Sequence, residues 1–243
     1  MSSMENAMHL PAIPIFLHIP DAFLSAPVAL TFYILSGIAF GLAVRQANRT
    51  LKESTAPLMG VLAAFIFAAQ MMNFPVAGGT SGHMLGGALA AILLGPWAAI
   101  IVMTSVVGIQ ALVFQDGGLA VLGANVFNMG VATAIAGYAV YRVVAMAGRY
   151  SRPFILAATA AAAWISVMLA ALLTSIQLVI SDTSEMSVVL PAMLGVHALI
   201  GIGEGLISAG AVALVLTARP DLLGVEPEEI DSVGYSNLSG ERT

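Results

Sequence analysis

The chain has 243 residues, of which 59% are hydrophobic and 9% are charged, and its mean hydropathy is +0.97. Soluble domains are roughly 45–50% apolar and about 25% charged, so this composition excludes a soluble protein. A net charge of −5 with only eight Lys and Arg residues argues against nucleic-acid binding, and the absence of cysteine excludes disulfides and thiolate metal ligands. At about 20 residues a span, the chain has room for about six or seven crossings. We therefore predict an all-α polytopic membrane protein.

The first 16 residues differ from the rest of the chain. They contain no basic residue, and Pro11 and Pro14 break the apolar run that ends them, so they fit neither a span nor an ordinary signal peptide. We interpret residues 1–16 as an N-terminal extension that the mature protein need not contain. Residues 17–219 are then the membrane-embedded domain, and residues 220–243 a flexible acidic cytoplasmic tail.

The predicted spans follow from apolar runs and from the basic residues between them. The clear runs cover about residues 26–44, 56–72, 122–140, 153–180 and 188–217. Residues 84–114 are apolar too, but Gly95 and Pro96 split them. All eight basic residues fall into three clusters, Arg45 with Arg49 and Lys52, Arg142 with Arg149 and Arg152, and Arg219 with Arg242. The positive-inside rule places every cluster in the cytoplasm only if residues 84–114 form two segments hinged at Pro96. The prediction is then about seven transmembrane helices, with the N-terminus outside and the C-terminus cytoplasmic.

A polar, glycine-rich stretch from Asn73 to Gly87 interrupts the apolar runs and contains His83. Its backbone groups would stay unpaired in hydrocarbon, so we expect neither a lipid-facing helix nor a packed strand, but irregular chain against protein or water. Glycine lets such a chain approach a ligand closely. A histidine at the edge of a span is a functional-site hypothesis, although a simple turn with a solvated histidine is the plain alternative.

The predicted topology brings two histidines and several acidic residues to the outer end. The polar residues expected there are His18, Asp21, Asn73, His83, Asp116, Asp182 and Glu185. An outer surface with carboxylates and imidazoles but no Lys or Arg attracts cations. Imidazole suits nickel, cobalt, copper and zinc, whereas calcium and magnesium prefer oxygen ligands. We therefore predict a transition-metal site at His18 and His83, which should weaken as pH falls through the imidazole range near about 6.5.

Two further groups of polar residues each have two interpretations. His197 and Glu204 lie on one face of the last predicted span. They could belong to an ion path, or form a hydrogen-bonded pair that locks this span into the bundle, and we expect Glu204 to lie at a different depth from His83. The run from Gln115 to Gly118, with Asn125 and Asn128 after it, predicts either an outer turn that supports the site or a plain aspartyl-glycyl turn.

Several ordered motifs resemble one family. They are His18-Ile-Pro-Asp, Asn73-Phe-Pro-Val, Gly79-Thr-Ser-Gly-His83 with Gly86-Gly87, Gln115-Asp-Gly-Gly118 and Gly123-Ala-Asn125. Together they resemble the CbiM/NikM family, the substrate-binding membrane (S) components of energy-coupling factor (ECF) transporters for cobalt and nickel, over about residues 17–219. The resemblance implies a multi-pass protein of a prokaryotic cell membrane that captures Ni²⁺ or Co²⁺ and carries no resident cofactor. It also implies partners, namely a transmembrane coupling subunit, ATP-binding subunits and a small accessory CbiN/NikN-like membrane subunit.

The resemblance also implies a ligand set. In the family, the metal is held by a free amino terminus, the amide and ring of the following histidine, and the ring of the histidine in the glycine-rich segment. Carried over, His18 and His83 supply three nitrogens, and the amine would come from Leu17 if the product begins there, through a UUG start codon or proteolytic trimming. A planar set of four nitrogens favours Ni²⁺. Asn73, Ser81, Asp116 and Asn125 are the expected lining residues.

Two other functional classes remain open at this stage. A self-sufficient secondary permease for metal cations would normally carry paired charges within the membrane, and Glu204 is the only acidic residue deep in a predicted span. An intramembrane metalloenzyme with Glu204 as base would be expected to show a His-Glu-x-x-His motif, which the sequence lacks. The resemblance instead implies a non-enzymatic transporter subunit, and the sequence contains no phosphate-loop motif for ATP.

Overall fold

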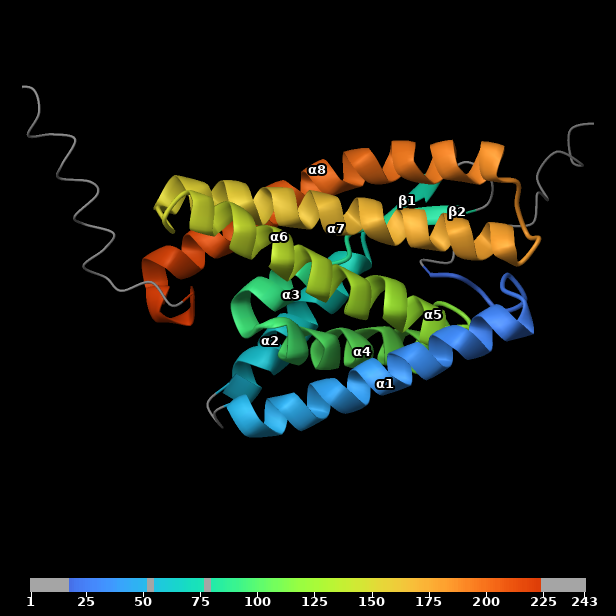
Figure 1. Ribbon diagram of the computed structural model, residues 1–243, viewed down its shortest axis with the longest axis horizontal. Coiled ribbons are helices and arrows are strands. Elements are labelled where there is room, and N and C mark those ends of the chain that lie inside the picture. The colour runs from blue at the N-terminus through green and yellow to red at the C-terminus, as the bar shows by residue number, and fades with distance from the viewer. Residues whose placement is uncertain (1–17, 52–54, 77–79, 224–243) are drawn as a thin grey trace, which may run out of the picture.

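The computed structural model describes residues 18–51, 55–76 and 80–223, with only the backbone described at residues 73–76 and 80–81. Helices dominate this part of the chain (Figure 1). Five are long and apolar enough to cross a membrane: α1 (Ala26–Thr50), α4 (Pro96–Val113), the segment Leu122–Ala147, α7 (Arg152–Ile180) and α8 (Met186–Ala218). Two shorter helices, α2 (Thr55–Gln70) and α3 (Gly87–Leu94), complete seven helical segments in the described residues. The prediction of an all-α polytopic membrane protein is confirmed.

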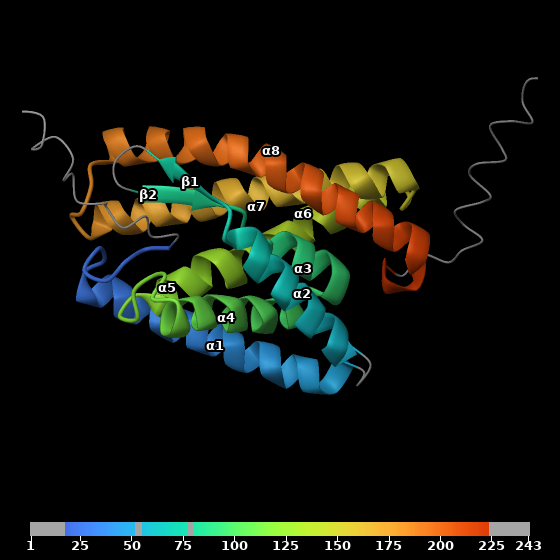
Figure 2. The same ribbon diagram turned by 180° about the vertical axis from the view of Figure 1, so that it is seen from behind.

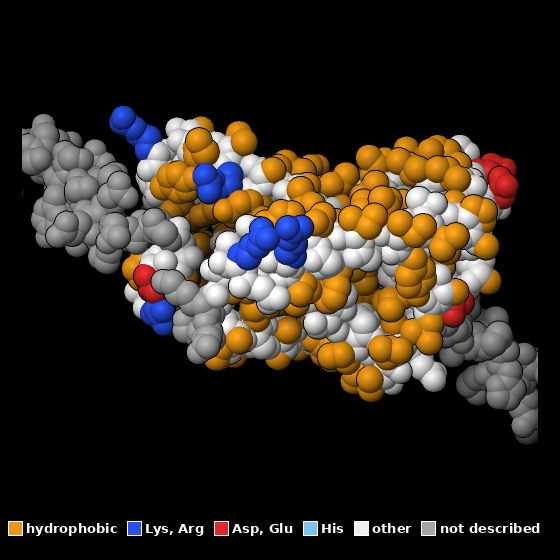
Figure 3. All heavy atoms as spheres, turned by 60° about the horizontal axis from the view of Figure 1, so that its bottom comes forward, with side chains coloured by type: hydrophobic (Ala, Val, Ile, Leu, Met, Phe, Trp, Pro, Cys, Tyr) orange, Lys and Arg blue, Asp and Glu red, His pale blue; other side chains and the backbone are white. Residues whose placement is uncertain are grey.

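The predicted split of residues 84–114 is also confirmed. Helix α3 ends at Leu94, Gly95 follows with a φ of 82°, and Pro96 begins α4. Proline starts a helix well because its missing N–H would have no helical partner there. The turn lies at the end of the bundle where Arg142, Arg149 and Arg219 gather around one pocket. Figure 3 shows arginine side chains, in blue, over one part of the visible face, and most of the acidic side chains, in red, at the opposite end. That this arginine end faces the cytoplasm stays a prediction from the positive-inside rule.

Helix α3 lies inside the bundle, where it packs against α4, α6 and α7 (Figure 2). Small residues allow this close packing: a methyl group at Gly87 would lie 1.9 Å from Thr133 Oγ1, and one at Gly137 would lie 2.6 Å from the Cβ of Ala88. Close approach through small residues is typical of helix contacts in membranes. The start of α3 is therefore fixed only a few residues after His83.

The segment Leu122–Ala147 changes its helical geometry along its length. It begins as α5 (Leu122–Val126), continues as a π-helical stretch, η2 (Phe127–Ala132), and ends as α6 (Thr133–Ala147). π-helical turns are rare and are frequent at functional sites. Here the side-chain amides of Asn128 and Gln177 exchange two hydrogen bonds of 2.8 Å, which join this segment to α7. Asn128 therefore lies in a helix and contributes to packing, and it does not form part of an outer turn.

The glycine-rich stretch forms a hairpin, so the expectation that it could not be a strand was wrong. Strands β1 (Asn73–Val76) and β2 (Thr80–His83) pair in antiparallel register, with Asn73 opposite His83. The two strands satisfy each other's backbone groups, which removes the cost of unpaired N–H and C=O groups on which the expectation rested. After His83 the chain turns inward and enters α3. The hairpin thus delivers His83 to the interior.

The outside of the bundle is apolar over long stretches. Leu199, Leu206 and Leu214 of α8 are each 70% exposed, and Leu30 of α1 is 61% exposed. Large contiguous apolar surfaces are rare on soluble proteins and are expected against lipid. A short 3₁₀ turn, η3 (Pro220–Leu223), follows α8. The predicted extension, residues 1–16, and the acidic tail from residue 224 onward lie outside the described residues.

Candidate metal site

The rings of His18 and His83 face each other although 65 residues separate them in the sequence. Their centroids lie 5.0 Å apart and the ring planes meet at 62°. His18 lies just before α1 and His83 ends β2, and both side chains are buried, with 6% and 4% exposure. The predicted pair of histidines therefore meets in space. Both residues lie in the connections at the end of the bundle that carries Asp21, Asp116 and Asp182.

Each imidazole places one ring nitrogen against a backbone carbonyl. Nδ1 of His18 lies 3.3 Å from the carbonyl oxygen of Asp116, and Nδ1 of His83 lies 2.8 Å from that of Met84. A carbonyl oxygen only accepts hydrogen bonds, so a neutral ring in this position carries its proton on Nδ1 and its lone pair on Nε2. Nε2 of His18 is buried and has no hydrogen-bond partner among the residues that the structure describes. A neutral imidazole nitrogen with a free lone pair is able to bind a metal ion.

The segment that carries His18 is held by a side-chain clamp from α5. Asn125 Oδ1 accepts a hydrogen bond from the Ile19 N–H, and Asn125 Nδ2 donates to the Ile19 carbonyl, both at 3.1 Å. The N–H of Gly118 donates to the same carbonyl at 2.9 Å. An amide side chain can donate one hydrogen bond and accept another, so Asn125 alone satisfies both the N–H and the carbonyl of Ile19. The predicted supporting role of Asn125 therefore has a structural basis.

The loop between α4 and α5 closes over His18. A side chain at Gly117, where φ is +87°, would have its Cβ 2.8 Å from the Cβ of His18, and a Cβ at Gly118 would lie 2.1 Å from Asp21 Oδ1. Asp21 Oδ1 accepts a hydrogen bond from the Ala120 N–H at 2.8 Å. The two glycines thus let the loop lie directly on the His18 segment. The carboxylate of Asp21 therefore holds this loop against the His18 segment.

Residues beyond His83 are held by two buried side chains from other helices. Both oxygens of Glu204 on α8 accept backbone hydrogen bonds, Oε2 from the Leu85 N–H at 2.6 Å and Oε1 from the Gly86 N–H at 2.9 Å. Gln70, at the end of α2, donates from Nε2 to the Leu85 carbonyl at 2.7 Å. Buried backbone N–H groups are almost always hydrogen-bonded in folded proteins, and here one side chain satisfies two of them. The chain just after His83 is therefore fixed to α2 and α8 together.

The structure excludes one of the two interpretations of His197 and Glu204. They do not bond to each other: Nδ1 of His197 contacts the carbonyl of Met193 at 2.8 Å, while Glu204 bonds to the backbone after His83. The difference in depth between Glu204 and His83 stays a prediction, since Glu204 bonds to residues two and three positions farther along the chain, whereas His197 acts electrostatically on His83 itself. Sequence analysis missed Gln70 altogether. Its signal was a lone amide at the end of an apolar run, immediately before the glycine-rich stretch.

Burial keeps both candidate ligands neutral. Loss of solvation lowers the pKa of His18 to about 4, and the bond to the Asp116 carbonyl opposes this shift only in part. Loss of solvation also lowers the pKa of His83 to about 3, with a further contribution from the neighbouring His18 ring. The pKa values of both histidines therefore lie below the value near 6.5 that the sequence analysis expected. At neutral pH both rings have a lone pair available for a cation.

Of the remaining predicted site residues, some lie near the histidine pair and others lie outside the described part of the chain. Asp116 lies next to the pair through its carbonyl, and its carboxylate acts electrostatically on His83. Leu17 and the side chains of Asn73 and Ser81 lie outside the described residues. Within the described part of the chain, no three His, Cys, Asp or Glu side chains come together to hold a metal. Further ligands to a cation between His18 and His83 would therefore be backbone groups, water or residues beyond the described set.

A comparison with protein families decides to which family this fold and site belong. The family described as "Cobalt uptake substrate-specific transmembrane region", CbiM, matches residues 18–222. The chain belongs to the CbiM family. This CbiM-family chain is 43% identical over 225 residues to a Haloquadratum walsbyi relative whose name assigns it to metal transport, covering 92% of this chain and 98% of the relative.

Two further relatives bear on function and fold. The fused nickel transport protein NikMN of Rhodobacter capsulatus is 36% identical over 226 residues, which are 85% of this CbiM-family chain but only 64% of the fused protein. A crystal structure described as a truncated transition metal transporter superposes with a TM-score of 0.77 at 32% identity, covering 83% of this chain and 99% of that one. The recognised family and the multi-pass membrane fold are thus confirmed, and relatives are named as transport proteins.

Proposed function

We propose that this chain captures Ni²⁺ or Co²⁺ for an ATP-driven ECF importer and binds the ion through nitrogen ligands at His18 and His83. The observation that carries the proposal is the burial of two facing imidazoles under a loop at the end of the bundle that lacks arginines. Neutral imidazole suits both metals. The family assignment and the transport names of its members support the same substrate class.

The ligand set that we propose extends from the two rings to the backbone. The amide and ring of one histidine can chelate a metal through Nδ1, the ring nitrogen nearer the backbone. In His18 this atom has only a long contact of 3.3 Å to the Asp116 carbonyl. Chelation through Nδ1 would replace this contact and would require the ring to carry its proton on Nε2 instead, so that the lone pair of Nδ1 faces the metal. An amine at Leu17 would complete four nitrogens, and a planar set of four would favour Ni²⁺ over Co²⁺.

We also propose that other proteins supply the energy. The sequence has no phosphate-loop motif, so we assign ATP hydrolysis to separate ATP-binding subunits that act through a transmembrane coupling subunit. The R. capsulatus relative is a fused protein of which this chain covers 64%, which supports a small accessory membrane subunit as a further partner. The end of the bundle with His18 and His83 would face outward, as the arginines at the other end predict.

A self-sufficient metal permease is the alternative, because His197 and Glu204 are both buried within α8, where His197 acts electrostatically on His83 and Glu204 bonds to the backbone just after it. Vesicles that contain this chain alone, or this chain with the coupling and ATP-binding subunits, separate the two functions. Uptake of nickel or cobalt that requires the partners and internal ATP is the expected result. Uptake by the chain alone, driven by an ion gradient, would establish the permease.

Metal content measured by mass spectrometry tests the ligand set directly. We would purify two forms, one beginning at Met1 and one beginning at position 17 with Leu17→Met, and offer nickel and cobalt together. Tight binding by the shorter form alone supports the terminal amine, and the ratio of the metals gives the preference. Equal binding by both forms removes the amine from the site. Absence of binding in both would contradict the capture function.

A further inference from the structure

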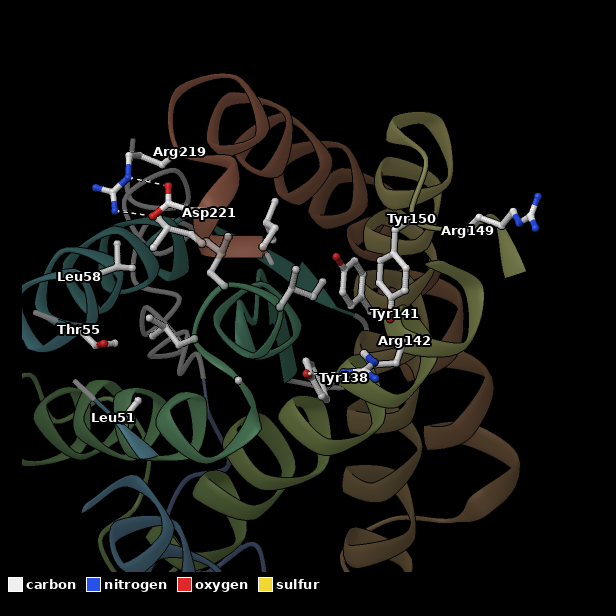
Figure 4. A pocket seen from close by; sticks show the side chains of 16 residues that line it. Leu51, Thr55, Leu58, Tyr138, Tyr141, Arg142, Arg149, Tyr150, Arg219 and Asp221 are labelled. Atoms are coloured by element: carbon white, nitrogen blue, oxygen red, sulfur yellow. Dashed lines mark hydrogen bonds and ion pairs between the residues drawn. The ribbon is translucent and has the colours of Figure 1, made fainter. Parts of the chain in front are cut away.

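A pocket opens at the arginine end of the bundle, away from the candidate metal site (Figure 4). Helix α4 separates the two, since it begins at Pro96, directly after Gly95 on the pocket wall, and ends at Val113, before Asp116 beside His18. The cavity volume is about 710 Å³, within the range of about 300–1,000 Å³ for small-ligand sites. Its walls come from the α1–α2 connection, the α3–α4 turn, α6, the α6–α7 turn and the chain after α8.

A buried hydroxyl in the pocket wall lacks a partner. Tyr141 is only 4% exposed, and its hydroxyl forms no hydrogen bond to any residue that the structure describes. Figure 4 shows its ring beside that of Tyr150, among the side chains that line the cavity. Buried hydroxyl groups are almost always hydrogen-bonded in folded proteins. A ligand with an acceptor atom in the cavity would satisfy the Tyr141 O–H.

One arginine of the wall is available to such a ligand. The Arg142 guanidinium lies 5.9 Å from the centre of the Tyr138 ring and donates to the Tyr138 hydroxyl at 3.4 Å. It has no carboxylate partner among the described residues, whereas Arg219 is engaged by Asp221 through two bonds of 2.8 and 2.9 Å. In Figure 4 the Arg149 side chain points away from the other lining residues. The contact with Tyr138 leaves most of the N–H groups of the Arg142 guanidinium available, and such a planar set of donors suits the oxygens of a phosphate.

The α3–α4 turn adds the positive end of a helix dipole. Gly95 and Pro96 start the 18-residue helix α4, and no side chain caps its first N–H groups. Anions bind favourably at such helix starts. Part of the wall is aliphatic, with Leu93, Leu94 and Leu222 among the lining residues, and the paired Arg219 and Asp221 line another part. The pocket therefore combines a site for an anionic group with an aliphatic surface.

We propose that this pocket binds a phosphate group, with Arg142 and the Tyr141 hydroxyl as its ligands at the start of α4. The phosphate belongs to the headgroup of an anionic phospholipid or to a small soluble phosphate. Basic pockets between transmembrane helices at the membrane surface bind anionic headgroups in this way. The aliphatic part of the wall favours the lipid, because it would receive the glycerol and the first acyl carbons.

Native mass spectrometry of the full chain tests the proposal with three probes: phosphatidylglycerol, phosphatidylcholine and inorganic phosphate. We expect phosphatidylglycerol to bind about tenfold more tightly than phosphatidylcholine, and Arg142→Gln to remove this preference. Arg152→Gln is the matched control, since Arg152 begins α7 at the same end of the bundle, bonds to Thr217 and does not line the pocket. It should change the preference less than about twofold.

Tyr141→Phe keeps the packing of the ring and removes only its hydroxyl, so it tests the site even if Arg142→Gln unfolds. It should weaken phosphatidylglycerol binding about threefold or more without lowering the melting temperature. Binding of inorganic phosphate that also needs Arg142 would identify the soluble source, and its failure to compete would identify the lipid. Equal losses in Arg142→Gln and Arg152→Gln would overturn the proposal. Binding that appears only after removal of residues 224–243 would assign the pocket to the acidic tail and would overturn it too.

Discussion

The carboxylate of Glu204 on α8 accepts a hydrogen bond of 2.6 Å from the backbone N–H of Leu85, two residues after His83. Gly86 donates to the other carboxylate oxygen, and Gln70 on α2 occupies the Leu85 carbonyl. Two helices, α2 and α8, thus fix one short turn. Because His83 immediately precedes this turn, the distance between the His83 and His18 rings depends on a residue in the last helix. Glu204 is a positioning residue for the candidate site.

Replacement of Glu204 by Gln should therefore weaken metal binding without removing a ligand. A glutamine has one acceptor oxygen, and its NH₂ group would face the second backbone N–H, so either Leu85 or Gly86 loses its partner. We expect Glu204→Gln to lower the affinity for Ni²⁺ by about tenfold, or about 1.4 kcal/mol, measured by isothermal titration calorimetry. Glu185→Gln is the control, since it makes the same charge change at the exposed start of α8. Similar losses in both variants would attribute the effect to net charge.

The two buried histidines near the turn should differ sharply in their effect on metal binding. His83→Gln keeps a donor for the Met84 carbonyl but removes the imidazole that faces His18, and we expect Ni²⁺ affinity to fall at least about 100-fold. His197→Gln changes the same group on α8, where Nδ1 bonds to the Met193 carbonyl, and should cost less than about threefold. Melting temperatures of the metal-free proteins check that both fold. Tight binding by His83→Gln would remove His83 from the site.

Local signals in the sequence were sufficient for much of this architecture. Pro96 and the arginine clusters predicted the split between α3 and α4, and the ordered histidine motifs predicted that His18 and His83 meet. These features depend on chain properties that act over one span or one turn, such as the missing N–H of proline and the sidedness of basic residues. They can therefore be inferred without knowledge of what each segment contacts.

The hairpin, the role of Glu204 and the burial of His83 depend on contacts between residues that no local sequence pattern identifies. The hairpin forms because β1 and β2 pair with each other, and a strand of four residues that contains Pro75 or Gly82 carries almost no strand signal of its own. The role of Glu204 depends on backbone N–H groups 118 and 119 residues away. The depth of burial was also not predictable: His83 lies in a glycine-rich stretch, which suggested a loosely packed loop, yet it is 4% exposed.

The pH dependence of binding should distinguish the rings from an amine ligand. With pKa values of about 4 for His18 and about 3 for His83, both rings are neutral from pH 8 down to about 5 and do not compete for protons there. An α-amino group has a pKa of about 7.7–8.0, and protonation below that range blocks its lone pair. In the form that begins at position 17, the amine should therefore contribute a loss of nickel affinity of about tenfold for each pH unit below about 7.5, in addition to the loss from the amide N–H of His18, which must also release its proton to bind the metal. A flat profile from pH 8 to 5 would exclude the amine.

The same pKa values have a consequence for stability that serves as a control in this titration. In the unfolded chain the histidines take up protons below about pH 6.5, whereas in the folded chain they remain neutral until about 4. The unfolded state thus binds more protons in this window, and the free energy of unfolding falls as pH falls from 6.5 toward 4. Circular dichroism at each pH would show where the chain remains folded. Affinities should be compared only within that range.

Close packing at the start of α3 gives a final prediction, about stability. Gly87 begins this helix four residues after His83, and a Cβ there would meet Thr133 Oγ1 at 1.9 Å and the Met129 carbonyl oxygen at 2.8 Å. Gly87→Ala should therefore reduce the free energy of unfolding by about 1–3 kcal/mol, since overpacking of a rigid contact forces α3 and α6 apart. Gly210→Ala on α8 is the control, because no atom lies within 4 Å of a Cβ there. In a helix this change gains up to about 1 kcal/mol. Thermal unfolding measured in detergent should show a lower melting temperature for Gly87→Ala and not for Gly210→Ala. Equal shifts in both variants would show that α3 can move away from Thr133.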